Sequence, residues 1–99
     1  MGLVTTDRGI LEQTIDAQIK IIPKLITNLR DPEFKKILQF KDETDVVFGM
    51  VLGGIIEKFN LYYITTHNTL QMPPDAMGET FEITLRRVRK IRESIFKCG

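Results

Sequence analysis

One apolar segment constrains the fold of this chain more than any other feature. The run from Val46 to Ile56 contains three glycines and no polar side chain. A helix that packs on one side has a single apolar stripe, whereas this run is apolar around its whole circumference and needs cover on every side. Each glycine inside a helix costs about 1 kcal/mol relative to alanine. We expect the close approach of a neighbouring helix to offset that cost.

The spacing of the glycines predicts how this packing occurs. Gly49 and Gly53 lie four residues apart and share one face of a helix, with Gly54 beside them. The rest of a short chain would leave part of this surface exposed, and monomeric proteins rarely expose such a patch. A second copy is the simplest cover, because a two-fold contact uses the same patch on both subunits. We therefore predict a homodimer in which this helix crosses its symmetry mate. Its interface would comprise Val46, Gly49, Met50, Gly53 and Gly54.

Hydrophobic periodicity predicts two helices in the first part of the chain. Residues 7–30 carry large apolar side chains at intervals of three and four, which places them on one stripe. Pro23 predicts a kink or a break in this helix, and the continuing stripe favours a kink. Asp31 and Pro32 are typical of a helix start and predict a short second helix. The apolar face of this short helix would consist of Phe34, Ile37, Leu38 and, at its end, Phe40.

Two further long helices complete the predicted fold. The third starts near Glu43, capped by Asp42 or Thr44, and ends between Asn60 and Thr66. A strand over 61–66 is the alternative, and we reject it because the chain offers no second alternating segment to pair with it. The fourth helix runs from about 75 to 97. Its apolar stripe would consist of Met77, Phe81, Leu85, Val88, Ile91 and Ile95. The sequence thus predicts an all-α domain over residues 1–99, a small bundle of three long helices and one short helix that dimerisation completes.

The sequence gives no support for catalysis or for a cofactor. His67 is the only histidine, and it lacks companion ligands at a metal-binding spacing. Cys98 is the only cysteine, and no adjacent base would activate it as a nucleophile. A glycine-rich phosphate-binding motif is also absent from the sequence. We predict a protein that is not an enzyme, with no catalytic residue, cofactor or metal.

The same composition indicates where the protein is found. A single cysteine cannot form an intramolecular disulfide, and the N-terminus lacks the pattern of a secretory signal. The apolar run is shorter than the roughly 20 residues that cross a bilayer, and Glu57 and Lys58 end it. We expect a cytoplasmic protein without a transmembrane segment.

The charge pattern provides one alternative function. Residues 86–97 contain six basic residues and one acid, although the net charge of the whole chain is only +1. Several of these bases lie on the helix face opposite the apolar stripe, where they would contact the phosphates of a nucleic acid. The alternative is therefore a nucleic-acid-binding module, which we do not favour because basic helix faces are usually solvated or paired with acids. Its contacts would be Arg86, Arg87, Arg89, Lys90 and Lys97.

Two more alternatives concern the central helix. A small-molecule or lipid pocket between subunits would be bounded by Phe48, Met50, Phe59 and Tyr62. In a monomeric bundle, the glycines would instead admit another helix of the same chain. We favour a helical interaction or regulatory module that self-associates through residues 46–56 and can also bind a protein partner.

Overall fold

A computed structural model describes residues 2–39 and 41–98, and regular structure in this part of the chain is entirely helical. The fold class predicted from the sequence is therefore confirmed. Phe40, assigned above to the short helix, lies outside the described residues. The helices are α1 (Thr5–Lys20), α2 (Ile22–Leu29), α3 (Pro32–Leu38), α4 (Glu43–Thr66), α5 (Pro74–Arg86) and α6 (Val88–Lys97).

Two of the predicted long helices are each divided in two. The first breaks at Ile21 instead of kinking, because Pro23 has no N–H group to bond the carbonyl of Ile19. The predicted C-terminal helix breaks at Arg87, where φ is −100° and ψ is 0°. Just before it, the Thr84 hydroxyl bonds the Thr80 carbonyl, a contact that bends helices.

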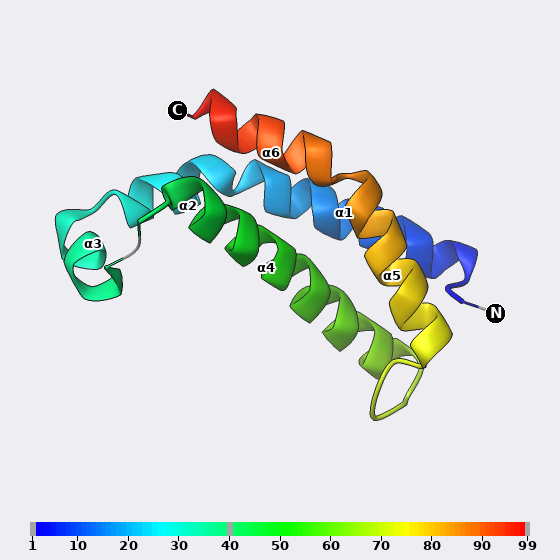
Figure 1. The fold of residues 1–99 in the computed structure, drawn as a ribbon. Helices are drawn as coiled ribbons and strands as arrows, with labels where there is room; N and C mark the ends of the chain where they lie inside the picture. The colour runs from blue at the N-terminus through cyan, green and yellow to red at the C-terminus, as the bar shows by residue number, and fades with distance from the viewer. Residues whose placement is uncertain (1, 40, 99) are drawn as a thin grey trace.

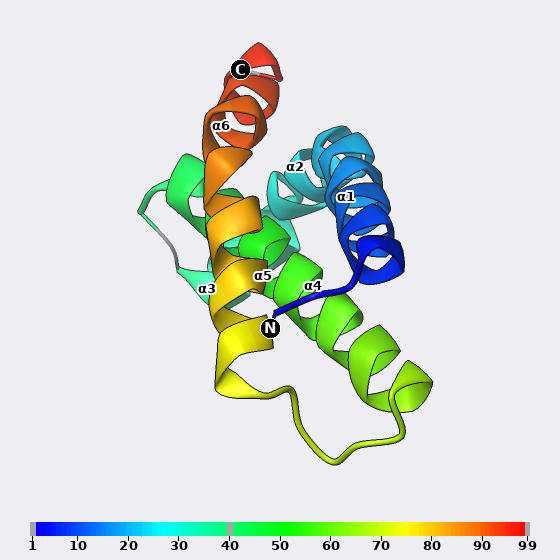
Figure 2. The same ribbon diagram turned by 90° about the vertical axis from the view of Figure 1, so that its right-hand side faces the viewer.

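Helix α4 is the central element of the fold. It contacts α1, α2, α5 and α6, and Figure 2 shows it between the α1–α2 pair and the α5–α6 pair. It remains helical through Thr66, so the strand alternative for residues 61–66 is wrong. Its buried face repeats every four residues, and α1, α2 and α6 supply the side chains that cover it. The core includes Val47, Val51, Ile55, Phe59 and Tyr63 of α4 with Leu11, Ile15, Ile22, Ile26, Ile91 and Ile95.

Helix α5 buries a different face from the one predicted. Phe81 and Leu85, assigned to the apolar stripe, are 47% and 64% exposed. The buried residues are instead Ala76, Thr80 and Thr84. Both threonine hydroxyls bond carbonyls one turn back within the helix, so their burial leaves no polar group unsatisfied. Small side chains on this face allow α5 to pack closely, and the larger ones remain outside.

Helix α3 projects from one end of an elongated molecule that measures 45 × 25 × 18 Å (Figure 1). The Asp31 side chain caps it as predicted, by accepting a 2.9 Å hydrogen bond from the Glu33 N–H. Gln39 ends it in the left-handed conformation, with φ at 51°. None of its residues is buried. Asp42 caps the next helix, α4, through the Asp45 N–H.

Helix α4 also has the length and composition of a membrane span, the only such helix in residues 2–39 and 41–98. The core helix of a globular protein passes the same test. Here one face of α4 is packed against α1, α2 and α6. Only 28% of the apolar window of α4 is buried within the subunit, and the absence of a transmembrane segment stays a prediction.

Candidate interaction surface

The outward side of α4 carries most of the predicted dimer interface. Gly49, Met50 and Gly53 are exposed there, and Val46 is half-buried beside them. We call these four residues the glycine face. A Cβ atom built on Gly49 or Gly53 would meet no atom within 4 Å. Neither glycine therefore admits a neighbouring helix within the subunit.

Gly54 has a different role from the other two glycines. A Cβ atom there would lie 2.6 Å from Oε1 of Gln18, a buried residue of α1. Gly54 thus lets α1 approach α4, as the monomeric-bundle alternative expects for all three glycines. Gly54 therefore serves packing within the subunit. Gly49 and Gly53 each cost the helix about 1 kcal/mol, and no contact within the subunit offsets that cost.

An apolar groove adjoins the glycine face at the junction of α2, α3 and α4. Its volume is about 430 Å³, and Val46 and Met50 belong to both surfaces. Asn28 is the only polar side chain in its lining, and the α2 and α3 contributions were not predicted from the sequence because they depend on how the helices meet. The lining consists of Leu25, Asn28, Leu29, Phe34, Leu38, Val46 and Met50.

The total surface area is large for a chain of this size. The protein exposes 6720 Å², whereas a compact folded monomer of 11.4 kDa exposes about 5800 Å². The excess of roughly 900 Å² is close to the roughly 800 Å² that each partner buries in a standard interface. A partner that covers the apolar surface around α4 would bring the exposed area to the usual value.

The basic residues predicted as nucleic-acid contacts do gather on one surface. With Glu93 and Ser94 they line a shallow hollow of about 330 Å³ along α6 and the end of α5. Arg87, however, forms ion pairs with Glu12 and Asp16 of α1. Arg86 is paired with Glu82, and Arg89 with Glu93 at 3.4 Å. Of the predicted five, only Lys90 and Lys97 form no ion pair within the described chain, although the charge of Lys90 contributes to lowering the pKa of Asp16.

The residues proposed for a pocket between subunits face different elements. Phe59 is buried in the core, and the guanidinium of Arg92 lies 4.0 Å from the ring centre of Phe48. Tyr62 bonds to Asp7 of α1, while Met50 lines the groove beside α2 and α3. A single subunit does not gather these four side chains around one cavity.

A buried polar cluster joins the start of α1 to the end of α4. Asp7, which is only 2% exposed, accepts a 2.9 Å hydrogen bond from the Tyr62 hydroxyl and another from the Val4 N–H. Nε2 of His67 lies 3.0 and 3.1 Å from the two carboxylate oxygens of Asp7. The His67 ring also stacks on Tyr63, with centroids 4.1 Å apart. Sequence reasoning missed this cluster because about 60 residues separate its members.

The electrostatics of this cluster favour a charged Asp7. Burial raises the pKa of the Asp7 carboxyl, but the hydrogen bonds from His67, Tyr62 and Val4 together outweigh burial and leave the pKa below its ordinary value. Burial and the neighbouring Asp7 raise the pKa of the Tyr62 phenol. None of the three side chains lines the groove or the basic hollow. The cluster therefore fastens α1 to α4 and does not form part of either surface.

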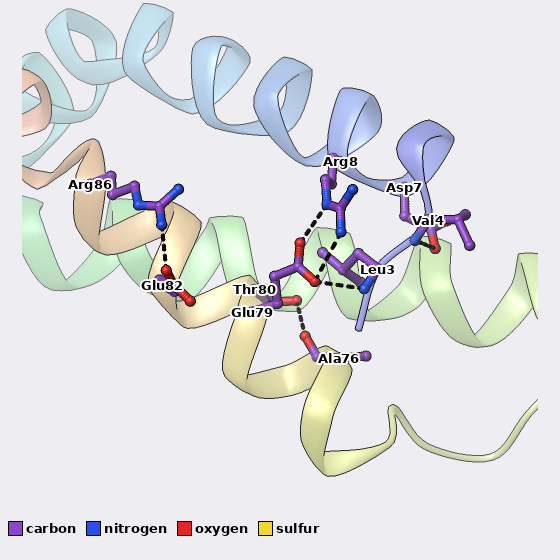
Figure 3. A network of polar contacts seen from close by, with 9 residues as sticks. All are labelled: Leu3, Val4, Asp7, Arg8, Ala76, Glu79, Thr80, Glu82 and Arg86. Carbon is purple, nitrogen blue, oxygen red and sulfur yellow. Dashed lines mark hydrogen bonds and ion pairs between the residues drawn. The ribbon is translucent and has the colours of Figure 1, made fainter. Parts of the chain in front are cut away.

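A second set of contacts fastens the N-terminal segment to α5. The Glu79 carboxylate accepts hydrogen bonds from the Arg8 side chain and from the Leu3 N–H (Figure 3). Leu3 is buried, and a Cβ atom on Gly2 would come within 2.1 Å of Glu79 Oε1. Hydrogen bonding from Arg8 and Leu3 lowers the pKa of Glu79. This segment is thus held closely against α5.

Comparisons with known proteins add no functional assignment. No protein-family model, curated protein or solved structure matches the chain. Among the described residues, no group of three histidine, cysteine, aspartate or glutamate side chains could hold a metal ion. The functional argument consequently depends on the surfaces described above.

Proposed function

We propose that this protein is a non-enzymatic helical interaction module that forms a homodimer through the glycine face of α4. One observation carries the proposal: Gly49 and Gly53 stand exposed on α4 with open space above them. Gly9 and Gly78 are likewise exposed with open space around them, but Gly49 and Gly53 share one face of the apolar run, where a second chain could approach the backbone closely and offset their helix cost. The excess exposed area supports the same conclusion.

The arrangement suits a contact between two identical chains. Met50 and Val46 add apolar area beside the glycines, and the groove extends it toward α2 and α3. A two-fold contact uses the same surface twice, so each apolar residue exposed in one subunit is covered by the other. No bound molecule is needed to complete such an interface. The dimer would then present two copies of every surface that lies outside the interface, and a protein partner could bind to both copies.

The test is the oligomeric state of a bulky variant compared with a matched control. Gly53→Leu places a large side chain on the glycine face. Gly9→Leu makes the same change at an exposed position of α1, where a Cβ atom also meets nothing within 4 Å. Light scattering after size exclusion should give twice the chain mass of 11.4 kDa for wild type and Gly9→Leu, and a monomer for Gly53→Leu. A wild-type monomer at high micromolar concentration would refute the proposal.

A nucleic-acid-binding module is the second candidate. Lys90 and Lys97 favour it, since both line the basic hollow and neither forms an ion pair in the described chain. The ion pairs of Arg86, Arg87 and Arg89 reduce the charge available to phosphates. Retention on nucleic acid that falls steeply with salt would support this candidate over self-association.

A further inference from the structure

The apolar groove at the junction of α2, α3 and α4 is large enough to receive a side chain. Its volume is about 430 Å³, and Phe34, Leu38 and Met50 in its lining each stay about half exposed. Helix α3 has only seven residues and buries none of them, so it is too short to be stable without further contacts. A side chain that enters the groove would cover these apolar residues and stabilise α3.

The groove lies beside the N-terminal end of the glycine face, and an exposed leucine lies beyond the other end. The α4 wall of the groove consists of Val46 and Met50. Glu57 and Leu61 follow Met50 after seven and eleven residues, so these three side chains share one side of α4, which we call the groove side. Leu61 is 62% exposed and lies about two turns after Gly53.

A two-fold contact between glycine faces can form in two ways, which treat the groove differently. If the α4 helices run parallel, the groove side of one meets the opposite side of the other. Both grooves then lie at one end of the dimer and both Leu61 side chains at the other. If the helices run antiparallel, the two-fold axis is perpendicular to them, and the groove side of one α4 meets the groove side of the other with its ends reversed.

The antiparallel arrangement places Leu61 next to the partner's groove. The contact centres on position 51, midway between Gly49 and Gly53. Leu61 follows this point by ten residues and therefore lies opposite position 41 of the partner, between the end of α3 and the start of α4. Leu38 and Val46, which line the groove, flank that position in the sequence. The exposed leucine of each subunit thus meets the apolar groove of the other.

We propose that the two α4 helices cross antiparallel in the dimer and that Leu61 of each subunit enters the groove of the other. This inference rests on the proposed function, because it specifies how the second copy covers the glycine face. Antiparallel packing covers both grooves and both exposed leucines in one contact, whereas parallel packing keeps each Leu61 away from the grooves. The excess area of roughly 900 Å² per chain is sufficient for an interface of standard size that includes the glycine face and the groove.

The acids near the glycine face are compatible with this arrangement. Asp45 lies one turn before Gly49, on the side of α4 away from the groove, whereas Glu57 lies on the groove side. Antiparallel packing joins equal sides of the two helices. Asp45 of one subunit and Glu57 of the other therefore lie at opposite edges of the contact, where charged side chains stay in solvent.

Disulfide cross-linking distinguishes the two modes of packing. Two single-cysteine chains, Leu38→Cys and Leu61→Cys, are made in a Cys98→Ser background and mixed under mild oxidation. Antiparallel packing predicts that the mixture forms a covalent heterodimer at least tenfold faster than either chain forms a homodimer. Leu85→Cys, equally exposed on α5, is the matched control for Leu61→Cys and should link to Leu38→Cys at least tenfold more slowly.

The other outcomes separate this inference from the proposed function. Faster formation of either homodimer would indicate parallel packing and overturn the inference, but it would leave the glycine-face dimer intact. A dimer by light scattering with no cross-link in any sample would also overturn it. A wild-type monomer at high micromolar concentration would refute the proposed function itself.

A charge placed at Leu61 provides an independent test that does not alter the groove. Leu61→Glu should weaken dimerisation about tenfold or more, because it would bring two carboxylates into apolar grooves. Leu85→Glu makes the same change at a side chain that is 64% exposed, and it should leave the dimerisation constant unchanged. Sedimentation equilibrium would measure both constants. Equal constants for Leu61→Glu and wild type would overturn the inference.

Discussion

Replacing Gly53 by alanine should raise the free energy of unfolding of the isolated subunit by about 1 kcal/mol. The residue lies inside α4, is exposed, and offers open space to a Cβ atom. The change therefore improves helix propensity without a packing penalty. With an unfolding entropy of about 2.1 cal/mol/K per residue, the gain corresponds to about 5 °C in Tm for 99 residues.

The neighbouring glycine should respond in the opposite way. In Gly54→Ala, the new Cβ atom would lie 2.6 Å from Oε1 and 3.2 Å from Cδ of Gln18. Gln18 is 4% exposed, so the amide end of its side chain has to shift within a packed site to make room. The loss of that packing offsets the gain in helix propensity. We expect Gly54→Ala to be no more stable than wild type.

Urea unfolding of both variants and wild type would measure the difference. At protein concentrations low enough for the subunit to be monomeric, Gly53→Ala should unfold at higher urea than the other two. At high concentration its advantage should shrink if the proposed dimer forms, because dimerisation would stabilise the wild type by mass action and the added methyl group would weaken the dimer. Equal gains at positions 53 and 54 would refute the reasoning, since they would show that Gln18 does not depend on Gly54.

Three other measurements test separate features. The pKa of Asp7 is lower in the folded state than in the unfolded state. Its ionised form therefore adds to the free energy of unfolding at a pH well above the unfolded pKa of about 3.9, and this stabilisation is lost as the pH falls through the folded pKa. Urea unfolding should therefore lose less stability between pH 5 and pH 2.5 in Asp7→Asn than in wild type. Leu85→Ser should change stability by less than about 0.5 kcal/mol, whereas Ile91→Ala should cost about 3 kcal/mol, as thermal unfolding would show. Lys90→Glu with Lys97→Glu should leave retention on nucleic acid unchanged. If both lysines instead contact phosphates, wild-type affinity for nucleic acid should fall about twelvefold when the salt concentration is raised from 50 to 200 mM.

The sequence was most informative where a long apolar segment starts at a cap. The apolar run from Val46 to Ile56 predicts a long central helix that starts near Glu43, and the structure confirms this helix and ends it at Thr66. Asp31 and Asp42 predict two helix starts because capping depends only on local geometry. These features require no knowledge of which helices become neighbours.

Tertiary packing decided the features that periodicity could not. On α5, a row of small residues and the row of Phe81 and Leu85 have the same four-residue spacing, and the approach of α4 and α6 selects the smaller row. The break at Arg87 places its side chain against acids of α1, a pairing that joins residues more than 70 positions apart. Likewise, only the position of Gln18 distinguishes Gly54 from the other glycines.

The contacts between α1 and α4 determine which side of α4 faces outward. The helices run in opposite directions (Figure 1), with Asp7 bonded near the end of α4 and Gln18 seated on Gly54 in its middle. Two such points, eleven residues apart on α1, prevent α4 from rotating about its axis without breaking the hydrogen bond between Tyr62 and Asp7. A rotated α4 could bury Gly49 and Gly53 against another helix of the same chain. The Asp7 cluster therefore helps to keep the glycine face exposed, and loss of its hydrogen bonds should weaken the proposed dimer as well as the fold.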